Sequence, residues 1–268
     1  MRITEQVVLG EDIPVLFAGP CAVESFDICM EIGTKTKEWA AKHGFSYVFK
    51  ASFDKANRTS AQSFRSIGMD KSLEVLQRVG KELDVPLVTD IHESYQAKEV
   101  AEVVDVLQIP AFLCRQTDLL LAAAETGKAV KVKRGQFMAP EDMQYAVKKV
   151  QSAGNPNVCL TERGFSLGYH NLVVDMRGLP TMRQYAPVVF DVTHSVQQPG
   201  AGGGTTSGDR SHVPALARAA LAAGADGLFV ETHPEPDRAI SDGPNQIPVD
   251  DFPALIRSAL AVWRAARA

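Results

Sequence analysis

Eight short apolar runs, each followed by a stretch of helical periodicity, constrain the fold of this chain more than any other feature. The runs are rich in β-branched residues, which indicates buried strands. They span residues 15–18, 47–50, 87–90, 106–109, 130–133, 158–161, 188–191 and 228–231. Amphipathic helices are predicted at 26–42, 71–83, 94–103, 119–126, 141–152, 213–223 and 250–266, with a weaker signal near 177–185.

Nearly continuous apolar strands predict a parallel sheet that is buried on both faces. Eight βα units suit a closed (β/α)₈ TIM barrel of the α/β class, and a doubly wound open sheet is the alternative. A length of 268 residues fits one such barrel. No linker divides the chain, so we expect a single domain over 1–268, with a short N-terminal extension at about 1–12.

Charge and composition exclude several classes of protein. The net charge of −4 argues against a nucleic-acid partner, whose binding surface would be basic. The first ten residues lack the pattern of a secretory signal, and no apolar run is long enough to span a membrane. The four cysteines form no Cys-x-x-Cys pair, so neither a zinc ribbon nor a disulfide framework is indicated. We therefore expect a cytoplasmic protein without a membrane partner.

The segment 197–210, QQPGAGGGTTSGDR, is too rich in glycine to hold one conformation unaided. It follows the seventh predicted strand. Long loops at this position of a barrel commonly close over the substrate. The sequence therefore predicts a mobile loop that acts as a lid.

Polar residues end or follow all eight predicted strands. The carboxyl ends of barrel strands form the catalytic face, so these side chains are expected to share one rim. They are Cys21, Lys50, Asp90, Gln108, Lys133, Glu162, Arg163, His194 and Glu231. Each taken singly has an alternative interpretation as a solvated strand end.

Four cations belong to this rim, namely Lys50, Lys55, Lys133 and Arg163. Their concentration in an acidic protein favours an anionic substrate, and the planar fork of arginine suits a carboxylate or phosphate. The alternative is a scatter of ordinary solvated cations.

A second group combines a thiol, an imidazole and two carboxylates. Cys21, His194, Glu231 and Asp242 offer ligands suited to zinc, iron(II), manganese or cobalt. Cys21 is alternatively a small buried residue, and His194 a general base. His233 competes for the ligand role because alternate residues of an extended segment share a face.

Five segments together resemble the 3-deoxy-D-manno-octulosonate 8-phosphate synthase family. They are AGPCAVES at 18–25, KASFDKANRTS at 50–60, FLCRQTD at 112–118, FDVTHS at 190–195 and ETHPEP at 231–236. The first segment is shared with the related 3-deoxy-7-phosphoheptulonate synthases. The second segment distinguishes the two families, because the heptulonate synthases carry a shorter Lys-Pro-Arg-Thr-Ser pattern at this position.

The resemblance implies a barrel enzyme, usually a homotetramer, that condenses phosphoenolpyruvate with D-arabinose 5-phosphate for lipopolysaccharide synthesis. It assigns Lys55, Lys133 and Arg163 to phosphoenolpyruvate, with Lys50 and Gln108 beside them. By the same resemblance, the sugar phosphate is bound by Asn57, Arg58 and Thr59, and by Arg115 from a neighbouring subunit.

The catalytic candidates are Cys21, Asp90, Lys133 and His194. Asp90, His194 and the metal site all remain open as the group that moves the protons. Two alternatives to the whole assignment also remain: a heptulonate synthase that accepts erythrose 4-phosphate, and a non-catalytic barrel that senses a sugar phosphate.

The family that this chain resembles has metal-dependent and metal-independent branches, and the independent branch carries Asn at the position of Cys21. Cys21 therefore predicts the metal-dependent branch, with His194, Glu231 and Asp242 as the other ligands. The segment 241–246, SDGPNQ, is mixed: its Asp-Gly-Pro resembles the independent branch and its Gln246 the other.

Overall fold

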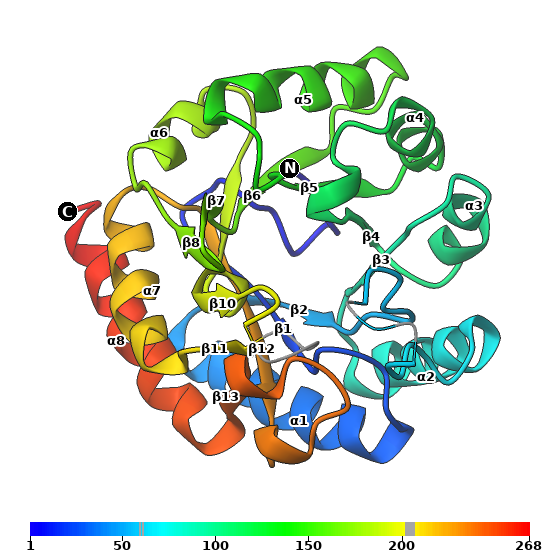
Figure 1. Cartoon of the computed structure of the whole chain (residues 1–268), viewed down its shortest axis with the longest axis horizontal. Helices are drawn as coiled ribbons and strands as arrows, with labels where there is room; N and C mark the ends of the chain where they lie inside the picture. Colours follow the sequence, from blue (N-terminus) through cyan, green and yellow to red (C-terminus); the bar gives the residue numbers. More distant parts are fainter. Residues whose placement is uncertain (59, 61, 202–206) are drawn as a thin grey trace.

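The computed structural model describes residues 1–58, 60, 62–201 and 207–268. Eight parallel strands follow one another around a ring, and the first closes it by pairing with the last, Val15 opposite Gly227 (Figure 1). The ring consists of β1 (Val15–Gly19), β2 (Ser46–Lys50), β3 (Leu87–Asp90), β4 (Val106–Ile109), β5 (Ala129–Lys133), β6 (Val158–Glu162), β9 (Val188–Asp191) and β12 (Gly227–His233). Closure confirms the predicted (β/α)₈ barrel and excludes the open sheet.

The helices form an outer layer around the ring. They are α1 (Phe26–His43), α2 (Met69–Leu83), α3 (Gln96–Ala101), α4 (Thr117–Glu125), α5 (Met143–Ser152), α6 (Gly178–Arg183), α7 (Val213–Ala222) and α8 (Phe252–Ala265). In α1, the Ser25 hydroxyl accepts a hydrogen bond from the Ile28 backbone N–H, and Gly44 ends the helix in the left-handed conformation. The weakly signalled helix near 177–185 is present as the short α6.

Several short strands and turns lie in the loops outside the eight barrel strands. The hairpin of β7 (Phe165–Gly168) and β8 (Asn171–Val173) was not predicted, because its strands are very short and mostly exposed. β13 (Ile247–Pro248) extends the sheet beside β12, and β10 (Gln197–Gln198) pairs with β11 (Ser207–Gly208). Short 3₁₀ turns lie at Ala111–Leu113, Pro140–Asp142, His194–Val196, Arg210–His212, Pro236–Arg238, Gly243–Asn245 and Val249–Asp251.

The predicted lid falls on β10, β11 and the residues that join them. Its two ends are held as an antiparallel pair, and Arg210 donates to the Gln246 carbonyl at 3.0 Å. The tip at 202–206 lies outside the described residues. The lid therefore stays a prediction.

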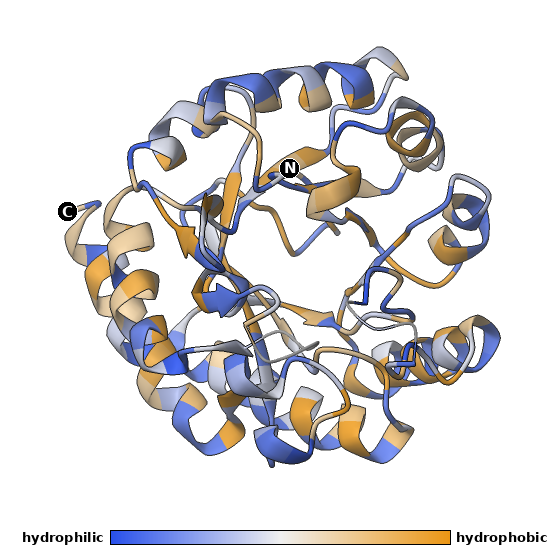
Figure 2. Cartoon of the chain, viewed as in Figure 1, coloured by the Kyte–Doolittle hydropathy of each residue, from blue (hydrophilic) through white to orange (hydrophobic). Residues whose placement is uncertain are grey.

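The hydrophobic core has two shells, since barrel strands bury both of their faces. The larger shell lies between the strands and the helices, and Figure 2 shows apolar strands inside a ring of helices that mix apolar and polar residues. The smaller shell fills the barrel interior. It contains Val15, Phe17, Val48, Val88, Val106, Ala129, Cys159, Val189 and Phe229.

The N-terminal extension completes this inner shell. Val7 and Leu9 belong to the interior cluster, and the segment folds back so that the Met1 ammonium donates to the Leu9 carbonyl at 2.8 Å. The predicted extension is therefore a floor for the barrel at the end opposite the predicted catalytic rim.

Two further sequence predictions bear on the fold. All four cysteines are described, and each is a buried free thiol. Over the described residues, no helix has the length and apolarity that a membrane span requires.

We expect Leu9→Ala to lower the free energy of unfolding by about 2–5 kcal/mol, because it leaves a cavity under the barrel. Ile13→Ala is the matched control, since Ile13 lies directly after the extension and is 53% exposed. Urea unfolding followed by circular dichroism measures both. Equal effects of the two substitutions would show that the extension does not contribute to the core.

Candidate active site

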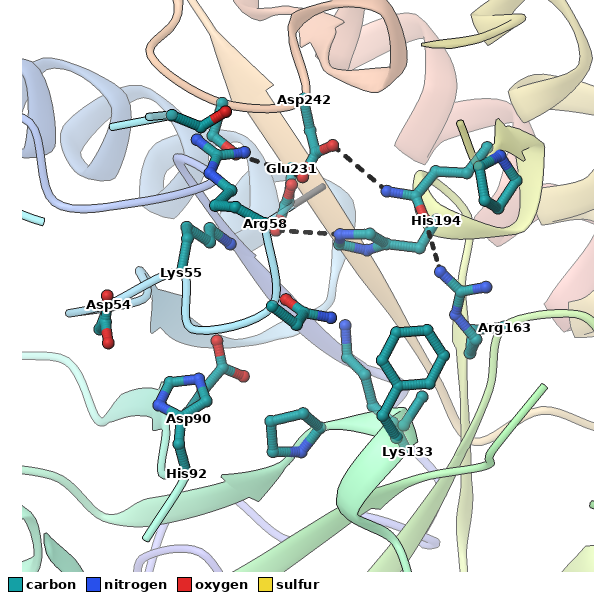
Figure 3. Close-up of a pocket in the computed structure, with 18 of the residues that line it drawn as sticks. Asp54, Lys55, Arg58, Asp90, His92, Lys133, Arg163, His194, Glu231 and Asp242 are labelled. Atoms are coloured by element: carbon teal, nitrogen blue, oxygen red, sulfur yellow. Dashed lines mark hydrogen bonds and ion pairs between the residues drawn. The ribbon is translucent and has the colours of Figure 1, made fainter. Parts of the chain in front are cut away.

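A cavity of about 560 Å³ opens at the carboxyl ends of the barrel strands. Figure 3 shows Lys55, Asp90, Lys133, Arg163 and His194 turned into this shared space. The predicted residues that line it are Lys50, Lys55, Asn57, Arg58, Asp90, Lys133, Arg163, His194, Glu231 and Asp242. Residues from segments far apart in the sequence thus meet at one rim, as the alternating strands predict.

Two lysines of the rim are held by buried carboxylates. Lys50, at the end of β2, lies 2.5 Å from a Glu231 oxygen, and Lys133, at the end of β5, lies 2.8 Å from an Asp191 oxygen. Burial works against the charged carboxylates, yet the nearby cations hold the pKa of both Asp191 and Glu231 below the usual range. The charges are therefore fixed in place before any substrate arrives.

Arg163 follows β6 and is positioned through its backbone. Glu162 accepts the backbone N–H groups of Arg163 and Gly164 at 2.9 and 2.6 Å, and it also pairs with the Arg134 guanidinium at 2.6 Å. One guanidinium nitrogen of Arg163 donates to Gln197, whereas its Nη1 atom is buried without a partner among the described residues. An unused charged donor at a cavity is suited to a phosphate or carboxylate oxygen.

Asp90 joins the polar contacts on the opposite wall. It accepts hydrogen bonds from the Ser52 hydroxyl and the Gln108 amide, and Ser52 accepts one from Lys55 at 3.0 Å. Burial disfavours the charged form, but Lys50 and Lys55 hold the pKa of Asp90 well below its usual range. Asp90 is therefore ionised at neutral pH and fixes the groups around it.

Three of the predicted metal ligands lie close together at one corner of the cavity, here called the metal corner. Ligand atoms of Cys21, Glu231 and Asp242 all lie within 4.8 Å of one another, and the Cys21 Sγ atom is 3.4 Å from an Asp242 oxygen. Glu231 Oε2 is buried with no hydrogen-bond partner in the described part of the chain. Burial and the Glu231 charge raise the pKa of the Cys21 thiol. A cation would satisfy the carboxylate and favour the thiolate, so these residues fit a metal ion.

The fourth predicted ligand lies beside this corner. His194 Nε2 is 3.6 Å from Glu231, while its Nδ1 contacts Asp191 at 2.8 Å. A carboxylate on one ring nitrogen leaves the other directed at the corner, an arrangement typical of metal-binding histidines. His233 instead lies 3.4 Å from Glu24, and its Nδ1 accepts the backbone N–H of Glu235.

The residues predicted to bind the sugar phosphate are only partly brought together. Asn57 and Arg58 line the cavity, and Arg58 donates to Ser241 at 2.8 Å. Thr59 lies outside the described residues. Arg115 is exposed and lines a separate hollow that includes His92 and Asp118.

Gln108, predicted to lie beside the phosphoenolpyruvate site, is not among the residues that line the cavity. It is buried, and its amide is used by Asp90 and by Lys131, whose ammonium donates to Gln108 Oε1 at 2.7 Å. Sequence reasoning overlooked Lys131 and Asp191. Asp191 ends a predicted strand and could have been found by the same strand-end rule as Asp90.

Comparisons with known proteins identify the family of the chain. A family model described as the DAHP synthetase I family matches residues 1–264. A curated 2-dehydro-3-deoxyphosphooctonate aldolase from Nitratidesulfovibrio vulgaris is 57% identical over 249 residues, covering 92% of this chain and 91% of the relative. Proteins of the same name from Brucella ovis (56%; 94% and 92% covered) and Cyanothece sp. (53%; 98% and 97% covered) also match.

We expect Asp191→Asn to lower the free energy of unfolding of the metal-free protein by about 3 kcal/mol, because it leaves the Lys133 ammonium without its buried partner. Asp175→Asn is the control, since the Asp175–Arg177 pair is exposed and contributes little. Chemical denaturation measures both. A loss for Asp191→Asn no larger than that of the control would show that the buried pair is not stabilising.

Proposed function

Because the chain belongs to the DAHP synthetase I family and matches 2-dehydro-3-deoxyphosphooctonate aldolases along nearly its whole length, we infer that it is an enzyme of this activity. It condenses phosphoenolpyruvate with D-arabinose 5-phosphate and water, releases inorganic phosphate, and forms 3-deoxy-D-manno-octulosonate 8-phosphate for lipopolysaccharide biosynthesis. The single observation that carries this assignment at the site is the cation-lined cavity, whose lining includes Arg163 with its unpartnered Nη1 donor.

We assign phosphoenolpyruvate to the side of the cavity formed by Lys55, Lys133 and Arg163. Acidic neighbours, Cys21 and Glu231 first among them, outweigh burial and raise the pKa of Lys55 above its ordinary value, so its ammonium is charged at neutral pH. Asn57 and Arg58, on the loop after β2, then face the sugar phosphate. Cations fixed in advance offset the mutual repulsion of two phosphorylated substrates.

The reaction needs the two substrates in register. The C3 carbon of phosphoenolpyruvate attacks the sugar aldehyde, water adds at C2, and cleavage of the C2–oxygen bond of the resulting hemiketal phosphate releases inorganic phosphate. The enzyme therefore accelerates the reaction mainly by holding the two reacting carbons together and by stabilising charge with fixed cations. Asp90 is a poor proton acceptor because its pKa is so low, so we assign it to orienting Ser52 and Lys55.

The corner formed by Cys21, Glu231 and Asp242, with His194 beside it, is assigned to a divalent metal ion. A thiolate with oxygen and nitrogen ligands suits zinc, iron(II), manganese or cobalt. When bound, such an ion supplies Lewis-acid chemistry. The unpartnered Glu231 Oε2 supports this assignment.

The oligomer and the compartment complete the proposal. We assign a homotetramer in which Arg115 reaches the sugar-phosphate side of a neighbouring site, which is consistent with its exposure outside its own chain's cavity. The cytoplasm is the expected compartment.

An assay with two aldose phosphates tests the activity. We expect phosphate release from phosphoenolpyruvate with D-arabinose 5-phosphate, and little with erythrose 4-phosphate. Turnover with erythrose 4-phosphate alone would indicate a heptulonate synthase. Saturable binding without turnover of either aldose would indicate a sensor.

Metal analysis tests the corner. We expect chelation to abolish activity and zinc, iron(II), manganese or cobalt to restore it. Cys21→Ser should also lower the bound metal measured by mass spectrometry after dialysis, whereas Cys29→Ser, at a buried thiol in α1, should retain it. Full activity of the metal-free enzyme, or undiminished metal in Cys21→Ser, would contradict the assignment.

A further inference from the structure

A lysine that the reaction does not use lies directly beneath the site. Lys131 is on β5, two residues before Lys133, so both side chains point into the barrel. Lys131 has no exposed surface, and its ammonium lies 4.5 Å from the ring centroid of Phe229 and 5.5 Å from that of Phe17. Burial, then Lys133, lowers the pKa of Lys131 to about 7. A buried amine in apolar surroundings is costly, so its presence calls for a reason.

The partner of Lys131 lies on the neighbouring strand in the same row. Gln108 on β4 is paired in register with Lys131 on one side and with Asp90 on the other. Lys131 donates to Gln108 Oε1 at 2.7 Å, and Gln108 Nε2 donates to Asp90. The row continues through Ser52, which donates to Asp90 and accepts from Lys55 at 3.0 Å.

The direction of these bonds makes Lys131 necessary. An amide has one donating end and one accepting end, and the ionised Asp90 only accepts, so it must face Nε2. Gln108 Oε1 is then turned into the barrel, where Lys131 is its donor. Without that donor, either Oε1 is buried unpaired or the amide turns and sets its oxygen against the Asp90 carboxylate.

We propose that Lys131 is a positioning residue that fixes the Gln108 amide, and through Asp90 and Ser52 holds Lys55 where it binds phosphoenolpyruvate. The inference rests on the proposed function. Either protonation state of the amine keeps an N–H for Gln108, so the positioning persists on both sides of neutral pH.

If Lys131 served only to stabilise the fold, Lys131→Met would change stability and phosphoenolpyruvate binding together. Lys131→Met removes a costly buried amine but also leaves Gln108 Oε1 without its donor, so the two effects on stability oppose each other. Lys131→Met should therefore fold with a stability close to that of the parent protein, and yet bind phosphoenolpyruvate poorly. The separation of stability from binding distinguishes positioning from packing.

The experiment compares steady-state kinetics and thermal unfolding of three metal-loaded variants. For Lys131→Met we expect the KM for phosphoenolpyruvate to rise about tenfold, as the loss of a buried hydrogen-bond donor implies, with the KM for D-arabinose 5-phosphate unchanged. Lys131→Gln retains a donor and should recover most of the loss. Lys148→Met, at an exposed lysine of α5, is the control for the substitution itself.

A double-mutant cycle with Gln108→Leu locates the effect. If Lys131 acts through Gln108, adding Lys131→Met to Gln108→Leu should raise the KM for phosphoenolpyruvate little further. Independent effects of the two substitutions, an unchanged KM in Lys131→Met, or failure of Lys131→Met to fold would each overturn the proposal. An inactive parent enzyme would instead count against the proposed function.

Discussion

The pairing of buried cations with buried carboxylates at the barrel rim is the constraint on which the site depends. Lys50 with Glu231, Lys133 with Asp191, and Arg134 with Glu162 each join the ends of different strands. Charges held this deeply need partners, because desolvation would otherwise favour their neutral forms. The closed barrel supplies those partners because β1 alone separates β2 from β12, and β6 alone separates β5 from β9, so that their inward side chains meet.

Two charged groups of opposite sign at the same rim each keep one atom without a partner. Arg163 Nη1 and Glu231 Oε2 are both buried at the cavity without a partner in the part of the chain that the structure describes. One suits an anion and the other a cation. The rim thereby combines a basic side suited to anions with a corner suited to a cation, within a chain whose net charge is −4.

Strand positions were predictable because each strand is a short apolar run with a polar end. The run at 188–191, for example, matches β9, and the run at 130–133 differs from β5 by a single residue. The β7–β8 hairpin escaped prediction because its strands are exposed, so burial imposes no pattern on them. The role of Leu9 as part of the barrel floor also depends on a chain reversal that local sequence does not show.

By itself, the sequence determined the eight βα units and which polar residues end their strands, since hydrophobic periodicity is a local property. It also carried the family resemblance. Only the tertiary structure decided how those residues are paired: that Gln108 bridges Lys131 and Asp90, that His233 faces Glu24, and that Arg115 lies outside the cavity of its own chain. Barrel closure and register set these contacts, because they determine which side chains share a layer.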